Sequence, residues 1–158
     1  MGMTQAVALI IAVALPLLVG ALGSIVTFRA VGDWYPRLVQ PSFAPPAWVF
    51  GPVWTMLYVM MGVASWLVWR HGTGQPEVRM ALILYAVQLA FNLGWSWLFF
   101  GMHRPFLALL EIVVLLVLIG VTALHFAALS RTAALLMIPY LGWVGFATVL
   151  NGALWWLN

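Results

Sequence analysis

The sequence predicts an all-α integral membrane protein, with one domain over residues 1–158 folded as a bundle of five transmembrane helices. Hydrophobic residues make up 66% of the chain and charged residues only 6%, whereas about 25% of a soluble domain is charged. The mean hydropathy is +1.11. All charged side chains except Glu111 lie at the borders of five long apolar stretches or between them. So few charges cannot cover a water-facing surface, which places the fold in a membrane.

Two clusters of charged residues, near residues 33 and 75, and two single arginines, Arg104 and Arg131, separate these stretches. About 20 apolar residues in a helix cross the hydrocarbon core, so each stretch can span the membrane once. Five crossings place the two ends of the chain on opposite sides. The arginines divide equally between the sides, so the positive-inside rule leaves the orientation open. The predicted helices cover residues 5–28, 47–69, 79–101, 105–128 and 133–156.

The one long connection, residues 29–46, is the candidate for a lid. Its four prolines fix φ and remove backbone donors, so it cannot be helical throughout. Its aromatic side chains provide apolar area that can fold against another surface. Two interpretations stay open, an aromatic belt at the membrane interface with a stiff turn, or a structured lid over a cavity. The residues concerned are Pro36, Pro41, Pro45 and Pro46, with Trp34, Tyr35, Phe43 and Trp48.

A polar stripe follows one face of the third predicted helix, where Tyr85, Gln88, Asn92, Trp95 and Phe99 recur at steps of three and four residues. An amide in hydrocarbon must find hydrogen-bond partners, so both amides are predicted to point into the bundle. They either hold helices together or form a cavity wall that fixes the polar edge of a ligand.

The opposite face of this helix carries small residues at four-residue spacing, Ala86, Ala90 and Gly94. Small residues let two helices approach closely, so this face is predicted to contact another helix. The contact would lie either within the bundle or in a homodimer.

Four different predicted helices place a polar or indole side chain at one depth, below the long connection. Trp54, Asn92, Glu111 and Asn151 each lie six to nine residues from that end, which corresponds to about 9–14 Å at 1.5 Å per residue. Apolar walls with a few polar anchors are typical of ligand sites. A carboxyl group inside a membrane helix is itself a functional candidate, although Glu111 could also extend toward Arg104.

Other kinds of site are excluded by composition. The chain has no cysteine, which excludes disulfides, zinc–thiolate sites, iron–sulfur clusters and covalent c-type haem. None of its three histidines lies at the predicted depth, so no metal site is predicted. Six scattered arginines are too few for a nucleic-acid surface. We therefore expect partners among membrane lipids and small ligands that carry carboxylates.

Three collinear motifs resemble those of the translocator protein family (TspO/MBR, the tryptophan-rich sensory proteins, or peripheral-type benzodiazepine receptors). They are WYPRLVQPSFAPPAWVFGPVWTMLY at residues 34–58, YAVQLAFNLGWSWLFFG at 85–101 and PYLGWVGFATVLN at 139–151. The resemblance implies a five-helix bundle, commonly a homodimer, in a bacterial cell membrane. It also implies a receptor or sensor for porphyrins such as protoporphyrin IX or haem, held without a covalent bond and involved in tetrapyrrole regulation.

Two further activities are implied by the same resemblance, light-dependent porphyrin breakdown and transport of tetrapyrroles or sterols. Trp54 and Trp143 would be the tryptophans of the photochemical reaction. The last helix ends in VLNGALWWLN, without the Tyr and basic residue of the animal sterol motif. The full predicted ligand-binding set is Trp34, Pro45, Pro46 and Trp48 in the lid, with Trp54, Tyr58, Gln88, Asn92, Trp95, Glu111, Trp143, Ala147, Leu150 and Asn151 in the cavity.

Overall fold

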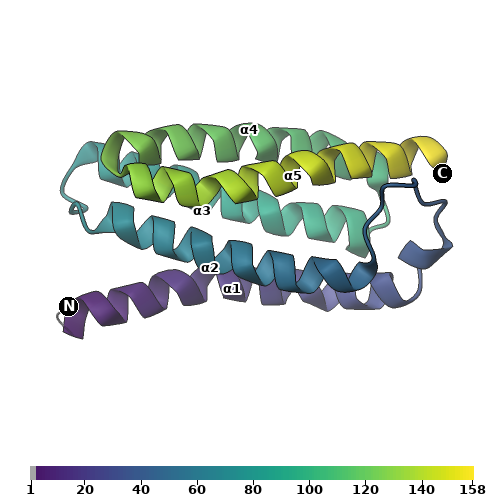
Figure 1. Cartoon of the computed structure of the whole chain (residues 1–158), viewed down its shortest axis with the longest axis horizontal. Coiled ribbons are helices and arrows are strands. Elements are labelled where there is room, and N and C mark those ends of the chain that lie inside the picture. Colours follow the sequence, from purple (N-terminus) through teal and green to yellow (C-terminus); the bar gives the residue numbers. More distant parts are fainter. Residues whose placement is uncertain (1–2) are drawn as a thin grey trace.

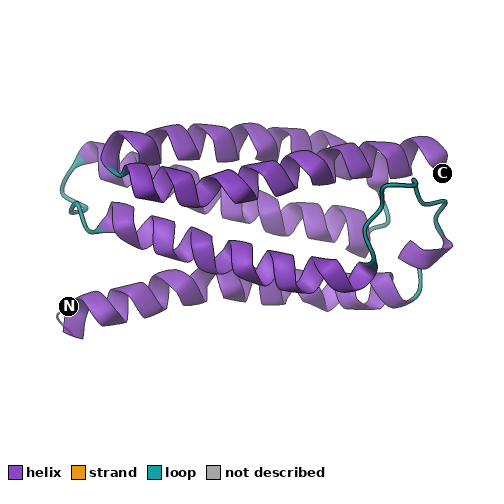
Figure 2. Cartoon of the chain, in the orientation of Figure 1, coloured by secondary structure: helices purple, strands orange, loops and turns teal. Residues whose placement is uncertain are grey.

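The computed structural model describes residues 3–158 and confirms the predicted all-helical fold, with no strand in this range (Figures 1 and 2). Each of the five long helices is long and apolar enough to cross a membrane. The helices are α1 (Met3–Gly32), α2 (Phe50–Trp69), α3 (Pro76–Ser96), α4 (Pro105–Leu129) and α5 (Arg131–Leu157), with 3₁₀ turns at Tyr35–Arg37 and Ala47–Val49 and a π-helical turn at Trp97–Gly101.

Helix ends depart from the predicted ones in both directions. α2 begins at Phe50 rather than at residue 47, because residues 47–49 form a 3₁₀ turn, whereas α1 ends later and α3 begins earlier than predicted. α1 continues past Arg29 to Gly32, so the proline-rich connection comprises residues 33–46 rather than 29–46. α3 begins at Pro76, three residues earlier than predicted, because proline fits the first helical position and Glu77 complements the helix dipole. Ser130 starts α5 by accepting a hydrogen bond from the backbone N–H of Ala133.

The two ends of the bundle carry different connections. The first described turn of α1 lies at one end, with the α2–α3 and α4–α5 connections (Figure 1). The proline-rich connection, the α3–α4 connection and the C-terminus lie at the other end. An odd number of crossings is therefore confirmed.

α1 lies at the edge of the bundle, against α2 and α3. It is the least buried of the five spans. Its contact with α2 depends on Gly62, because a Cβ at that position would lie 2.5 Å from Val13 Cα and 2.7 Å from the carbonyl oxygen of Ala12. The two backbones thus touch within the spanning parts of α1 and α2, as small residues allow.

The polar core is a hydrogen-bonded chain that joins α2, α3 and α5. Tyr140 donates to Gln88 Oε1 at 2.7 Å and accepts from Asn92 Nδ2 at 3.0 Å. Tyr58 donates to Asn92 Oδ1 at 2.7 Å. Both amides are buried, so the prediction that they point into the bundle is confirmed. The structure shows the first of the two predicted roles, hydrogen bonds that hold helices together.

Candidate functional site

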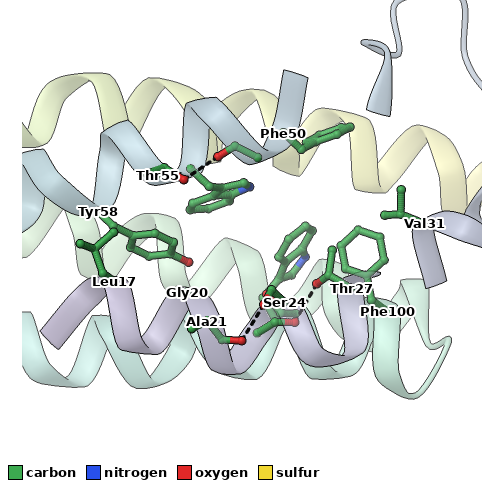
Figure 3. A pocket seen from close by; sticks show the side chains of 15 residues that line it. Leu17, Gly20, Ala21, Ser24, Thr27, Val31, Phe50, Thr55, Tyr58 and Phe100 are labelled. Carbon is green, nitrogen blue, oxygen red and sulfur yellow. Dashed lines mark hydrogen bonds between the residues drawn. The ribbon is translucent and has the colours of Figure 1, made fainter. Parts of the chain in front are cut away.

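Two adjoining cavities lie between the polar core and the proline-rich connection. The larger has a volume of about 370 Å³ (Figure 3) and is lined by Leu17, Gly20, Ala21, Gly23, Ser24, Thr27, Val31, Phe50, Gly51, Trp54, Thr55, Tyr58, Trp95, Ser96 and Phe100. The smaller has a volume of about 20 Å³ and is lined by Tyr35, Phe50, Trp54, Trp95, Phe99, Phe100, Trp143, Ala147, Leu150, Asn151 and Leu154. Four aromatic residues, Phe50, Trp54, Trp95 and Phe100, line both cavities.

The larger cavity has mostly apolar walls, although hydroxyl groups lie along it. Ser24, Thr27 and Thr55 each donate to a carbonyl oxygen of their own helix, at 2.7–2.9 Å. Figure 3 shows these side chains on the facing walls formed by α1 and α2. Because Ser24 and Thr55 are also exposed at the surface, the cavity reaches the membrane-facing side of the bundle between α1 and α2.

Gly20 of α1 allows the ring of Tyr58 to pack against α1, where both residues line the larger cavity. A Cβ at Gly20 would lie 2.4 Å from Cε2 of Tyr58, so only glycine leaves room for this ring. Trp54 stacks on the same ring with a centroid distance of 5.5 Å. The ring of Tyr58 thereby separates the cavity from the polar core, where its hydroxyl is bonded to Asn92.

The smaller cavity is held open by fixed side chains of α3 and α5. The Trp95 indole N–H donates to Asn151 Oδ1 at 3.0 Å, and Asn151 Nδ2 donates to the carbonyl oxygen of Pro105 at 2.8 Å. In the π-helical turn, Met102 N bonds to Trp97 O at 2.8 Å. The wider turn brings Phe99 and Phe100 to a ring distance of 4.8 Å, and Trp95 packs on both rings.

The proline-rich connection covers the smaller cavity mainly with Tyr35, which is 7% exposed. Burial raises the pKa of this phenol above its usual value, so the hydroxyl keeps its proton. The ring of Trp34 stacks on His103 at 4.3 Å and packs edge-on against Phe99. These contacts join the connection to the α3–α4 turn.

Asn158 ties the connection to the end of α5. Its side-chain oxygen accepts from the backbone N–H of Val39 at 2.8 Å, and its Nδ2 donates to the Val39 carbonyl at 3.2 Å. The Asn158 amide thus both accepts a hydrogen bond from the backbone of Val39 and donates one to it.

We expect Asn158→Ala to loosen the connection. Each lost hydrogen bond is worth about 1 kcal/mol, so amide hydrogen exchange at Val39 and its neighbours should become about fivefold faster or more. Exchange measured by mass spectrometry in detergent micelles or nanodiscs tests this. Trp156→Ala is the matched control, because Trp156 is 81% exposed on the same helix end. Equal exchange in both variants would contradict a tether at Asn158.

The structure places half of the predicted ligand-binding set on the cavity walls. Those residues are Trp54, Tyr58, Trp95, Trp143, Ala147, Leu150 and Asn151, and they include both tryptophans that the resemblance links to porphyrin photochemistry. The predicted residues that line neither cavity are Trp34, Pro45, Pro46, Trp48, Gln88, Asn92 and Glu111. Trp48 is 76% exposed, as an interfacial side chain would be.

Glu111 lines neither cavity, although it was predicted to lie at the same depth as Trp54 and Asn151, which do. Its carboxyl group lies against α3, where a Cβ on Gly94 would be 3.3 Å from Glu111 Oε1. Both carboxyl oxygens are buried, and neither has a hydrogen-bond partner among residues 3–158. The small residue at position 94 makes room for this group, so Gly94 serves a contact within the bundle. Ala86 and Ala90, on the same face, are exposed.

Sequence reasoning missed the wall that α1 contributes and the part played by Tyr35. The signal for α1 was a series of small and hydroxyl residues at helical spacing, Gly20, Gly23, Ser24 and Thr27. This pattern differs from the large aliphatic residues expected on a face that contacts only lipid.

A five-helix bundle with an aromatic cavity beneath one long connection defines a multi-pass membrane protein with a ligand-sized internal site. Residues 12–157 match the model of the TspO/MBR family, and the chain belongs to this family. It is 45% identical over 154 residues to the tryptophan-rich protein TspO of Chlorobaculum tepidum, with 98% of each chain covered.

Two further relatives show how widely the similarity extends. The tryptophan-rich protein TspO of Archaeoglobus fulgidus is 38% identical over 158 residues, which is all of this chain and 99% of that one. The human translocator protein is 41% identical over 123 residues, covering 77% of this chain and 73% of its own. The resemblance inferred from the three motifs is thus confirmed.

Proposed function

We propose that the protein is a membrane receptor or sensor that binds porphyrins such as protoporphyrin IX or haem in the two adjoining cavities, in a bacterial cell membrane. Membership of the TspO/MBR family supports the receptor or sensor role. The observation that carries the choice of ligand is the shared aromatic wall, Phe50, Trp54, Trp95 and Phe100. A flat apolar ring system packs well against such side chains.

The cavity also suits an anionic amphiphile that extends beyond it. Its volume of about 370 Å³ lies at the lower end of the range for ligand pockets, and it opens between α1 and α2. A large ring would therefore reach into this opening. Arg29 in the last turn of α1 and Arg104 at the start of α4 are exposed. These two helix ends lie at the same end of the bundle (Figure 1), where guanidinium groups can pair with the carboxylates of a porphyrin. Arg37 already pairs with Asp33.

The test is porphyrin binding by purified protein in nanodiscs, followed by the shift of the porphyrin absorption band. We expect the double variant Trp54→Ala, Trp143→Ala to lose at least tenfold in affinity for protoporphyrin IX, because both indoles line the smaller cavity and Trp54 lines the larger one as well. The control is Trp69→Ala, Trp156→Ala, which removes two exposed indoles that line neither cavity. Equal affinities in the two double variants would contradict the proposed site.

A further inference from the structure

Two residues that line the smaller cavity carry hydrogen-bond donors without a partner in the described chain. The hydroxyl of Tyr35 and the indole N–H of Trp143 are both buried, and neither makes a hydrogen bond within residues 3–158. Both residues line the smaller cavity. A buried donor without a partner is unfavourable, and in native proteins such groups commonly face a bound molecule or an ordered water.

The two residues come from different parts of the fold, and their rings both contact Phe50. Tyr35 belongs to the proline-rich connection and Trp143 to α5. Both pack edge-on against Phe50, with centroid distances of 6.4 and 5.9 Å. Two other indoles lie on this wall, those of Trp54 and Trp95, and the N–H of Trp95 is already bonded to Asn151. Among the described residues of this wall, the side chains of Trp95 and Asn151 are hydrogen-bonded, whereas the donors of Tyr35 and Trp143 are not.

The volume limits what these donors can bind. About 20 Å³ is little more than one water-sized probe requires, so the smaller cavity holds one small group and no ring. The larger cavity, which shares its aromatic wall, has room for an apolar body. One ligand can occupy both only if a compact polar group projects from an apolar core.

The chemistry of the two donors selects an acceptor. An indole N–H donates and never accepts, and a protonated phenol readily donates. Two donors on neighbouring side chains match a carboxylate, since hydrogen bonds to an ionised oxygen are the stronger kind.

We propose that the smaller cavity is a carboxylate subsite, in which the Tyr35 hydroxyl and the Trp143 N–H bind one acidic side chain of the ligand while its ring lies in the larger cavity. This inference rests on the proposed porphyrin-binding function and adds to it a selection among porphyrins. Tyr35 acts as a specificity-determining residue, and the proline-rich connection takes part in binding rather than only covering the site.

The test compares two porphyrins and two conservative variants. Protoporphyrin IX carries carboxylates, whereas etioporphyrin carries only alkyl groups on a similar ring. We expect Tyr35→Phe to weaken protoporphyrin IX binding at least fivefold and to change etioporphyrin binding less than twofold, in nanodiscs. The control is Tyr85→Phe, which removes another buried hydroxyl without a partner but lies outside both cavities. It should change neither affinity.

Tyr35→Phe keeps the ring and breaks no hydrogen bond within the described chain, so the variant should fold normally. Trp143→Phe should show the same selective loss. If wild type and Tyr35→Phe bind protoporphyrin IX equally, or if Tyr35→Phe loses both porphyrins alike, the carboxylate subsite is wrong while porphyrin binding stands. If wild type binds neither porphyrin, the proposed function is wrong and the subsite falls with it.

Discussion

Gly62→Ala is expected to destabilise the protein by about 3 kcal/mol, at the upper end of the effect of overpacking. The added methyl group would lie 2.5 Å from Val13 Cα and 2.7 Å from the carbonyl oxygen of Ala12. Both contacts are with backbone atoms, which cannot turn aside as the end of a flexible side chain does. α1 must therefore move away from α2.

Moving α1 would also alter the larger cavity, since α1 supplies one wall and Gly20 holds the ring of Tyr58 against it. We expect porphyrin affinity to fall together with stability. Thermal unfolding in detergent micelles measures the first effect. Gly120→Ala is the matched control, because no atom lies within 4 Å of a Cβ built on Gly120 of α4. Similar unfolding temperatures for the two variants would contradict the close α1–α2 contact.

The second large effect is expected for Tyr140→Phe, with a loss of about 2 kcal/mol. This change removes one hydroxyl that bonds both Gln88 and Asn92 and leaves two buried amides short of a partner. Interhelical hydrogen bonds in membranes are worth about 0.6 kcal/mol on average and about 1.7 at most. Stranding a buried polar group costs about 1–3 kcal/mol.

A graded series tests this assignment. Tyr58→Phe removes one hydrogen bond and should cost about half as much as Tyr140→Phe. Tyr85→Phe removes a hydroxyl that lies beside Ser65 without a hydrogen bond of normal geometry and should cost the least of the three. Unfolding by sodium dodecyl sulfate, followed by circular dichroism, ranks the three variants. A loss for Tyr85→Phe as large as that for Tyr140→Phe would show that the hydrogen-bonded chain does not stabilise the bundle.

The sequence was sufficient for the five spans because charge and hydropathy alone decide what can lie in hydrocarbon. It also predicted that Gln88 and Asn92 point inward, since an amide facing lipid would lack partners. Periodicity identifies a face of a helix, but it does not identify the neighbour that this face meets. For that reason both a cavity wall and a hydrogen-bonded core were consistent with the stripe on α3, and the structure shows the second.

Glu111 illustrates the limit of reasoning from depth. Its distance from the membrane boundary matched that of Trp54 and Asn151, yet depth fixes only one of the two coordinates of a residue on a helix. Rotation about α4 places its carboxyl group against Gly94. Similarly, proline and tryptophan content indicated a structured connection, but which of its aromatic side chains points inward depends on backbone turns such as the 3₁₀ turn at Tyr35–Arg37.

The π-helical turn at Trp97–Gly101 makes the length of this segment as important as its composition. Such a turn holds one more residue than an ordinary α-helical turn. Deleting one residue before Phe99 would let the turn relax into a regular α-helix and would change the directions of the side chains within it. Phe99 and Phe100 would then leave their places beside Trp95. A one-residue gap at this point would therefore reshape the site more than most substitutions in it.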